Sequence, residues 1–207
     1  MAEPPDDLAT LKMRYEPWIP RNLECAEYWK PNPVDWLVVA ESPPCPRSDE
    51  QWQKPKYMYR IREKRKGGHL LGAVLSGFLD EEFDEALRKW KHPRRLSELR
   101  GVHGFVLDLC EYPTDQLDDD DARSGEWKAS LPEFNLRLGR KNPANIIVLG
   151  GLGGEEFGGI VRNGLKPQLR VLVRNDFAIP FPHRGHYSDC RDGIRECVRQ
   201  VRMSGKP

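Results

Sequence analysis

Short apolar runs of strand length recur along the chain. Three of them cover residues 35–40, 104–109 and 145–150, and a fourth covers residues 169–173, with 177–179 close behind. Their nearly continuous apolar character is typical of strands that are buried on both faces, as in a parallel sheet. We therefore expect a central, mostly parallel sheet of four strands.

Apolar residues at helical spacing fill the segments between these runs. Residues 70–90 carry leucine, valine and phenylalanine every three or four positions, 155–161 follow a glycine-rich turn, and 189–203 have one apolar face. The alternation predicts an α/β fold: a single, three-layer domain in which helices flank the central sheet. Residues 1–33 are rich in proline and are expected to wrap, as an N-terminal segment, around a domain formed by residues 34–207.

Charge is balanced overall but segregated along the chain. The 207 residues include 33 Lys and Arg against 32 Asp and Glu, a formal net charge of +1, which excludes a uniformly basic, histone-like binder. Basic residues gather at 54–66, 88–100 and 184–202, and acidic residues gather at 111–121. The first basic segment also holds two tyrosines, and this mixture favours nucleic-acid binding because cations neutralise phosphates while aromatic faces stack on bases. The alternative for each segment is an ordinary solvated surface.

Five cysteines are spread over the chain without any Cys-x-x-Cys pair. This spacing argues against a disulfide framework, a zinc ribbon and an iron–sulfur cluster, so we expect free thiols, and neither metal nor cofactor. The apolar stretches are far shorter than the ~20 residues of a membrane-spanning helix, and the acidic N-terminus lacks the apolar core of a secretory signal. We expect a cytoplasmic monomer without membrane contact. The acidic run at residues 118–121 is expected to form an exposed loop.

Acidic residues, prolines and histidines are concentrated in the segments at the ends of three predicted strands, at residues 40–44, 108–113 and 180–186. In an open parallel sheet, ligands bind in the crevice beyond the carboxyl ends of the strands. If these strands are neighbours, the three loops open on one crevice. We expect the functional site there.

Glu41 directly follows the first predicted strand, and two prolines stiffen the turn behind it. A carboxylate on such a loop can orient a water molecule or stabilise a developing cation; alternatively, it caps nearby amides. Asp108 ends the second strand within an apolar pattern, where a charge requires either a partner or a chemical task. His183 and His186 lie in the last loop and are candidate hydrogen-bond donors to a ligand, or else surface histidines.

A glycine run at residues 150–154 follows the third strand and precedes a helix. It is similar to a dinucleotide-binding fingerprint, and Asp176 lies about 20 residues further on. However, Glu156 occupies the position of the third glycine, where its carboxylate would face a pyrophosphate. A tight strand-to-helix turn is therefore the favoured interpretation.

The order of these features resembles the uracil-DNA glycosylase superfamily. Its members have a central parallel sheet, a first-strand loop of the type Gly-Glu-Ala-Pro-Gly, a base-stacking aromatic soon after it, and a final His-Pro-Ser loop. Residues 40–44, Ala-Glu-Ser-Pro-Pro, match the first loop, and residues 181–183, Phe-Pro-His, occupy the place of the last. Tyr57 or Tyr59 falls where the stacking aromatic would be, and Asp108 stands where many members carry a base-recognising asparagine.

The chain departs from that pattern at three points. Phe181 stands in place of the histidine, unless His183 or His186 substitutes for it. Asp108 in its ionised form accepts hydrogen bonds but donates none, unlike asparagine. The cysteines that bind a cluster in some members are missing.

The resemblance implies a DNA glycosylase of base excision repair, without an iron–sulfur cluster, that flips and excises uracil or a related deaminated base from single- or double-stranded DNA. The implied catalytic residues are Glu41, Asp108 and His183. The implied base-binding residues are Ser42, Pro43, Tyr57, Tyr59 and His186. The implied DNA contacts are Lys54, Lys56, Arg60 and Arg184, the last of which would fill the hole left in the duplex. Two other classes stay open: a catalytically silent nucleic-acid-binding relative, and a nucleotide-cofactor enzyme that uses residues 150–154.

Overall fold

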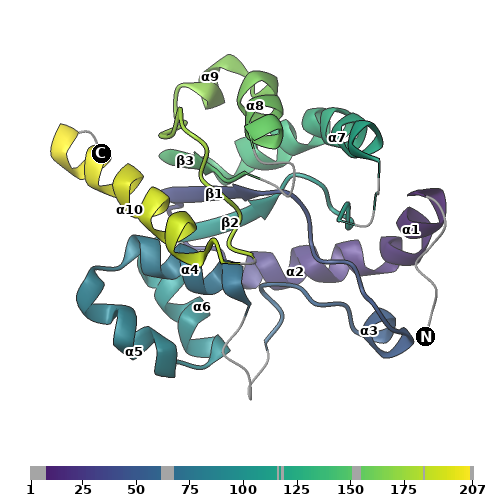
Figure 1. Ribbon diagram of the computed structural model, residues 1–207, viewed down its shortest axis with the longest axis horizontal. Coiled ribbons are helices and arrows are strands. Elements are labelled where there is room, and N and C mark those ends of the chain that lie inside the picture. The colour runs from purple at the N-terminus through teal and green to yellow at the C-terminus, as the bar shows by residue number, and fades with distance from the viewer. Residues whose placement is uncertain are drawn as a thin grey trace.

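The computed structural model describes residues 8–61, 68–115, 117, 119–150, 155–183 and 185–205 (Figure 1). The strands are β1 (Trp36–Ala40), β2 (Gly104–Asp108) and β3 (Asn145–Val148). The helices are α1 (Leu8–Tyr15), α2 (Ile19–Trp29), α3 (Asp49–Gln53), α4 (His69–Phe78), α5 (Asp84–Lys89), α6 (His92–Gly101), α7 (Asp120–Lys141), α8 (Glu155–Gly164), α9 (Pro167–Arg170) and α10 (Tyr187–Ser204). Two short 3-10 helices are η1 (Glu16–Trp18) and η2 (Glu81–Phe83).

The three strands form one open, parallel sheet in the order β2-β1-β3. Trp36 pairs with Gly104 on one side and with Asn145 on the other, and the register runs on to Ala40 opposite Asp108. The strands coincide with the first three apolar runs of the sequence, and nearly all their residues are buried. This confirms the prediction of parallel strands that are covered on both faces.

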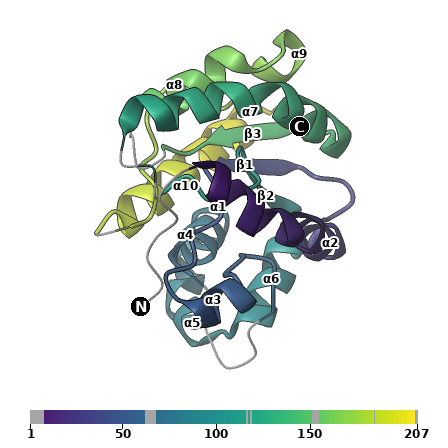
Figure 2. The same ribbon diagram turned by 90° about the vertical axis from the view of Figure 1, so that its right-hand side faces the viewer.

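Helices cover both faces of the sheet. α7, α8 and α9 lie on one face and α4 and α6 on the other, while α10 packs along α4 (Figures 1 and 2). The predicted helices over 155–161 and 189–203 correspond to α8 and α10, whereas the predicted helical segment 70–90 is divided into α4, η2 and α5. The fold is the expected α/β arrangement, with an open parallel sheet between helices.

The fourth predicted strand, residues 169–173, is not a strand. Pro167 lies in the first turn of α9, where a proline is favoured because its missing N–H would have no partner. At the end of the run, Val173 forms an isolated parallel bridge to Ile146, and Ile179 forms a second one to Leu149. Within the described residues the sheet therefore has three strands, and the prediction of four was wrong.

Asn175 explains why the ladder is interrupted between these two bridges. Its side-chain Nδ2 donates to the carbonyl oxygen of Val148 at 2.8 Å, and its Oδ1 accepts from the Val148 N–H at 2.9 Å. Asn175 is only 2% exposed. A side-chain amide thus satisfies backbone groups of β3 that a neighbouring strand would otherwise pair with.

The N-terminal residues 8–29 form helices that pack on the α/β body. Leu11, Tyr15 and Ala26 point inward and are buried. The amide of Asn22 on α2 donates to Tyr15 Oη at 3.0 Å and accepts from Arg60 Nη2 at 2.9 Å. These bonds fix α2 against the segment that carries the two candidate tyrosines.

The acidic residues 119–121 begin α7 instead of forming a loop as expected. Asp119 is the N-cap residue, and its Oδ1 accepts a 3.0 Å hydrogen bond from the Asp121 N–H. Carboxylates in the first turn are favoured by the orphan amides and by the helix dipole. Asp118 lies outside the described residues.

Candidate functional site at the carboxyl edge of the sheet

The ends of the strands bring the candidate loops to one edge of the sheet. Ala40 at the end of β1 pairs with Asp108 at the end of β2, so Glu41 and Asp108 occupy neighbouring strand ends. The Cys110 N–H donates to the Glu41 carbonyl oxygen at 2.9 Å, which continues the pairing past the strands. The bridge of Ile179 to Leu149, just beyond β3, starts the loop of residues 180–186 from the same edge.

Glu41 is a buried carboxylate, 5% exposed, with side-chain donors around it. Its Oε1 accepts hydrogen bonds from Thr114 Oγ1 at 2.8 Å and from Trp127 Nε1 at 3.3 Å. Thr114 Oγ1 also lies 3.0 Å from Ser42 Oγ, and the Ser42 Oγ accepts from the Thr114 N–H at 3.2 Å. The turn after β1 is thereby held to the loop after β2, and the Glu41 carboxylate is fixed in orientation.

Asp108 is half-buried, and the pKa of its carboxyl group is raised above its ordinary value. Burial raises the pKa of Asp108 to about 7; the nearby Glu41 charge also raises it, while the Arg137 guanidinium lowers it. Among the residues that the structure describes, no side chain donates a hydrogen bond to this carboxyl group. Near neutral pH, Asp108 can therefore either accept a proton or donate a hydrogen bond.

A small cavity joins several predicted site residues. Pro43, Tyr57 and Asp108 line it together with Arg137, and Asn22 is one of the α2 residues that complete its wall. Its volume is about 30 Å³, which holds roughly two water molecules. A nucleobase is larger than this cavity.

Tyr57 and Tyr59 have different environments. Tyr59 is 2% exposed, and its hydroxyl donates to the Val106 carbonyl oxygen at 3.1 Å and accepts from the Val106 N–H at 2.6 Å. Its ring stacks on Phe105 in the core, with the centroids 5.1 Å apart. The expectation that Tyr59 contacts a base is therefore corrected: it is a core residue that packs against β2. Tyr57 is half-buried, lines the cavity, and stays the candidate for base stacking.

The predicted DNA contacts of segment 54–61 fall into two groups. Lys54 and Lys56 are exposed. Arg60 turns inward, where it donates to the Pro55 carbonyl oxygen at 2.8 Å as well as to Asn22. Arg60 therefore holds α2 in place in this structure. The fourth predicted DNA contact, Arg184, lies outside the described residues, as do residues 62–67 and 151–154.

The basic segment 184–202 carries less free positive charge than its sequence suggests. Its described arginines pair with carboxylates of α10 itself and of the η2–α5 region. The pairs are Arg191 with Asp84 and Asp192, Arg195 with Glu81 and Asp84, Arg199 with Glu196, and Arg202 with Asp80. Such surface pairs add little stability, but they neutralise the charges that would otherwise attract DNA.

The two candidate histidines start from the same edge but do not line the cavity within the described part of the chain. His183 is half-buried, and its Nδ1 lies 3.0 Å from the Phe181 carbonyl oxygen. His186 is exposed, and its Nδ1 lies 3.1 Å from Asp189 Oδ2 in the first turn of α10. The two rings are 5.9 Å apart. His183 is thus the less exposed of the two.

Sequence reasoning missed three residues that shape the site: Thr114, Trp127 and Arg137. Arg137 is 9% exposed, and its Nη2 donates to the carbonyl oxygens of Leu109 at 2.6 Å and of Asp108 at 3.2 Å. The signal was present in the helical spacing, because Arg137 shares the buried face of α7 with Phe134 and Leu138. An arginine on an apolar helix face indicates a buried carbonyl or carboxylate partner.

No family model matches this chain, and comparisons with curated proteins and with solved structures return no significant match. The resemblance to uracil-DNA glycosylases therefore stays a prediction from the sequence motifs. In the described ranges, no three His, Cys, Asp or Glu side chains cluster in a way that could hold a metal ion. Those ranges also contain no helix long and apolar enough to cross a membrane.

Proposed function

We propose that this chain is a DNA glycosylase that hydrolyses the N-glycosidic bond of uracil or a related deaminated base. The observation that carries the proposal is the pairing of Ala40 with Asp108, which brings the backbone of Glu41 and of Asp108 to neighbouring ends of parallel strands. Tyr57 and Pro43 line the same cavity as Asp108. A carboxyl group beside an aromatic ring is suited to activate water next to a flipped base.

In the proposed reaction, the oxygen of a water molecule forms a bond to C1′ of the deoxyribose while the bond from C1′ to the base nitrogen breaks. The bonding electron pair leaves with the base, which departs as an anion. Asp108 in its ionised form takes the proton that the water loses. Its pKa of about 7 lets it accept this proton and release it again near neutral pH.

Glu41 is proposed to stabilise the positive charge that develops on the sugar. Thr114 and Trp127 already hold its carboxylate, so little reorganisation accompanies the reaction. His183 is proposed to donate a hydrogen bond to the departing base, because its loop starts from the same edge of the sheet. Tyr57 would stack on the base once the cavity has widened.

The proposal is tested by incubating the protein with oligonucleotides that contain a single uracil or hypoxanthine, in single- and double-stranded form. Alkali-labile abasic sites are the expected product. Glu41→Gln and Asp108→Asn should each slow their formation at least about a hundredfold while DNA binding is retained. Asp35→Asn is the matched control, because Asp35 precedes β1 at the opposite edge of the sheet and pairs there with His103.

The assay also separates the proposal from a catalytically silent relative. Salt-sensitive DNA binding without release of any base would favour the silent relative and reject the glycosylase. Equal rates in the wild type, Glu41→Gln and Asp108→Asn would remove both carboxyl groups from the mechanism.

A further inference from the structure

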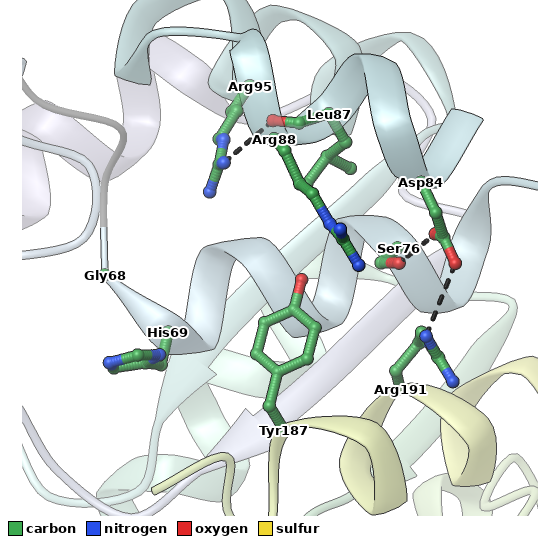
Figure 3. Close-up of a pocket in the computed structure, with 9 residues that line it drawn as sticks. All are labelled: Gly68, His69, Ser76, Asp84, Leu87, Arg88, Arg95, Tyr187 and Arg191. Carbon is green, nitrogen blue, oxygen red and sulfur yellow. Dashed lines mark hydrogen bonds and ion pairs between the residues drawn. The ribbon is translucent and has the colours of Figure 1, made fainter.

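A second, larger pocket lies outside the candidate site, between α4, α5, α6 and the start of α10 (Figure 3). Its volume is about 390 Å³. Arg88 and Arg95 reach into it from α5 and α6, and Tyr187 reaches into it from α10 on the other side. Gly68 and His69, at the N-terminus of α4, form one end of the pocket.

Arg95 is the unusual member of this pocket, since it is a buried cation without a counter-ion. It is 7% exposed, and its Nη2 donates to the Leu87 carbonyl oxygen at 2.8 Å. Its Nε has no hydrogen-bond partner. No carboxylate among the described residues forms an ion pair with Arg95. Burial of a guanidinium in this way costs free energy unless an anion compensates for it.

The acidic residue of the pocket does not supply that anion. Asp84 accepts a hydrogen bond from Ser76 and pairs with Arg191 and Arg195, both at 3.4 Å. Arg191 pairs with Asp192 as well. The charge of Asp84 is thereby matched on the α10 side of the pocket. Arg88 is exposed and, like Arg95, forms no ion pair with a described carboxylate, so the α5–α6 side carries an excess of positive charge.

The N-terminus of α4 adds hydrogen-bond donors to the same space. The N-cap residue Gly68 provides no side-chain acceptor, so the amides of the first turn lack a capping partner from it. A Cβ at Gly72 would lie 3.1 Å from Arg95 Nη1 and 3.2 Å from Tyr187 Oη. The glycine therefore lets the guanidinium and the phenol approach this helix closely. Free amides at a helix N-terminus beside a guanidinium suit a phosphate group.

We propose that this pocket binds a phosphate group of the DNA strand whose base enters the candidate site. That the phosphate group belongs to DNA rests on the proposed function, whereas the binding of a phosphate group rests on the pocket alone. Two connections along the chain support DNA as the source of the phosphate. Tyr187 directly follows His186 of the last strand-end loop, and Gly68 follows the basic segment that carries Tyr57. A strand held in this pocket would thus lie beside both loops that face the candidate site.

The test measures binding of an undamaged, fluorescently labelled oligonucleotide, which requires no base release and so remains informative if the glycosylase assay fails. Arg95→Met and Arg88→Met should each weaken binding about tenfold or more. Arg94→Met is the matched control: Arg94 precedes Arg95 on α6 but stacks on Trp90, with its guanidinium 4.4 Å from the ring centroid. It should change binding less than twofold. If Arg95→Met, Arg88→Met and Arg94→Met all bind the oligonucleotide with the same affinity, the proposal is overturned.

Thermal melting separates phosphate binding from a structural role of Arg95. Inorganic phosphate should raise the melting temperature of the wild type and compete with the oligonucleotide, but it should not stabilise Arg95→Met. If Arg95→Met fails to fold, Arg88→Met carries the test, because Arg88 is exposed. The same stabilisation by phosphate in wild type and Arg88→Met would reject the site. Tighter binding of a free mononucleotide than of the oligonucleotide would reject the DNA strand as the source.

Discussion

The hydroxyl of Thr114 donates a 2.8 Å hydrogen bond to the carboxylate of Glu41, and both residues are buried. The bond joins the loop after β2 to the residue that directly follows β1. It fixes a charged group at the carboxyl edge of the sheet, where the fold brings the ends of neighbouring strands together.

Thr114→Val tests the importance of this bond. Valine has nearly the shape of threonine but lacks the donor, so the buried Glu41 carboxylate loses one of its partners. The free energy of unfolding should fall by about 1–3 kcal/mol, and base release should slow in parallel. Urea denaturation and the abasic-site assay measure the two effects. Thr114→Ser keeps the hydroxyl and should behave like the wild type; an equal loss in both variants would contradict the role given to the bond.

Asp108→Asn should remove a pH dependence of stability. The pKa of Asp108 is raised to about 7 in the folded protein, above its ordinary value of ~3.9, so between these values the folded state binds more protons than the unfolded state. Wild-type stability should therefore fall as pH rises from about 4 to 7, by up to about 1.4 kcal/mol per pH unit, and stay level above 7.

Chemical denaturation at pH 5 and pH 8 measures this difference. Asp108→Asn should lose less stability than the wild type between the two values. An unchanged difference in Asp108→Asn would show that Asp108 titrates in its ordinary range.

Tyr57 and Tyr59 should respond in opposite ways to substitution. Tyr59→Phe removes the hydroxyl that bonds both backbone groups of Val106, so it should destabilise the fold by about 1–3 kcal/mol and leave binding of uracil-containing DNA by the folded protein unchanged. Tyr57→Ala should weaken that binding by about 1–3 kcal/mol through lost stacking. Thermal melting and fluorescence anisotropy distinguish the two variants. Loss of DNA binding in folded Tyr59→Phe, with none in Tyr57→Ala, would reverse the assignment.

The first three strands and the helices α4, α8 and α10 follow from the sequence, because continuous apolar runs indicate strands that are buried on both faces and apolar residues at helical spacing indicate helices with one buried face. Helix α7, the longest of the described helices, was not predicted. The fourth strand could not be separated from a helix by hydropathy alone. Pro167 starts α9 just before the run at residues 169–173. The hydrogen bonds that satisfy the backbone of Val148 come from the side-chain amide of Asn175, which a hydropathy pattern does not reveal.

The candidate site was predictable at the level of loops but not of every side chain. Glu41 and Asp108 were found because acidic residues at the ends of apolar runs stand out. Tyr57 and Tyr59 are only two residues apart, and which of them enters the core depends on the position of β2. Arg137 was missed because its partners, the carbonyl oxygens of Asp108 and Leu109 and the carboxylate of Glu111, are far from it in the sequence.

The rate of base release as a function of pH is the most direct test of the two-carboxylate mechanism. Single-turnover assays on a uracil-containing strand should show a rate that rises with pH to a plateau, with a midpoint near pH 7, because the ionised form of Asp108 accepts the proton from water. Asp108→Asn should lose this titration together with most of the rate, whereas Asp35→Asn should keep both. A rate without this midpoint in the wild type, or the same midpoint in Asp108→Asn, would contradict the mechanism.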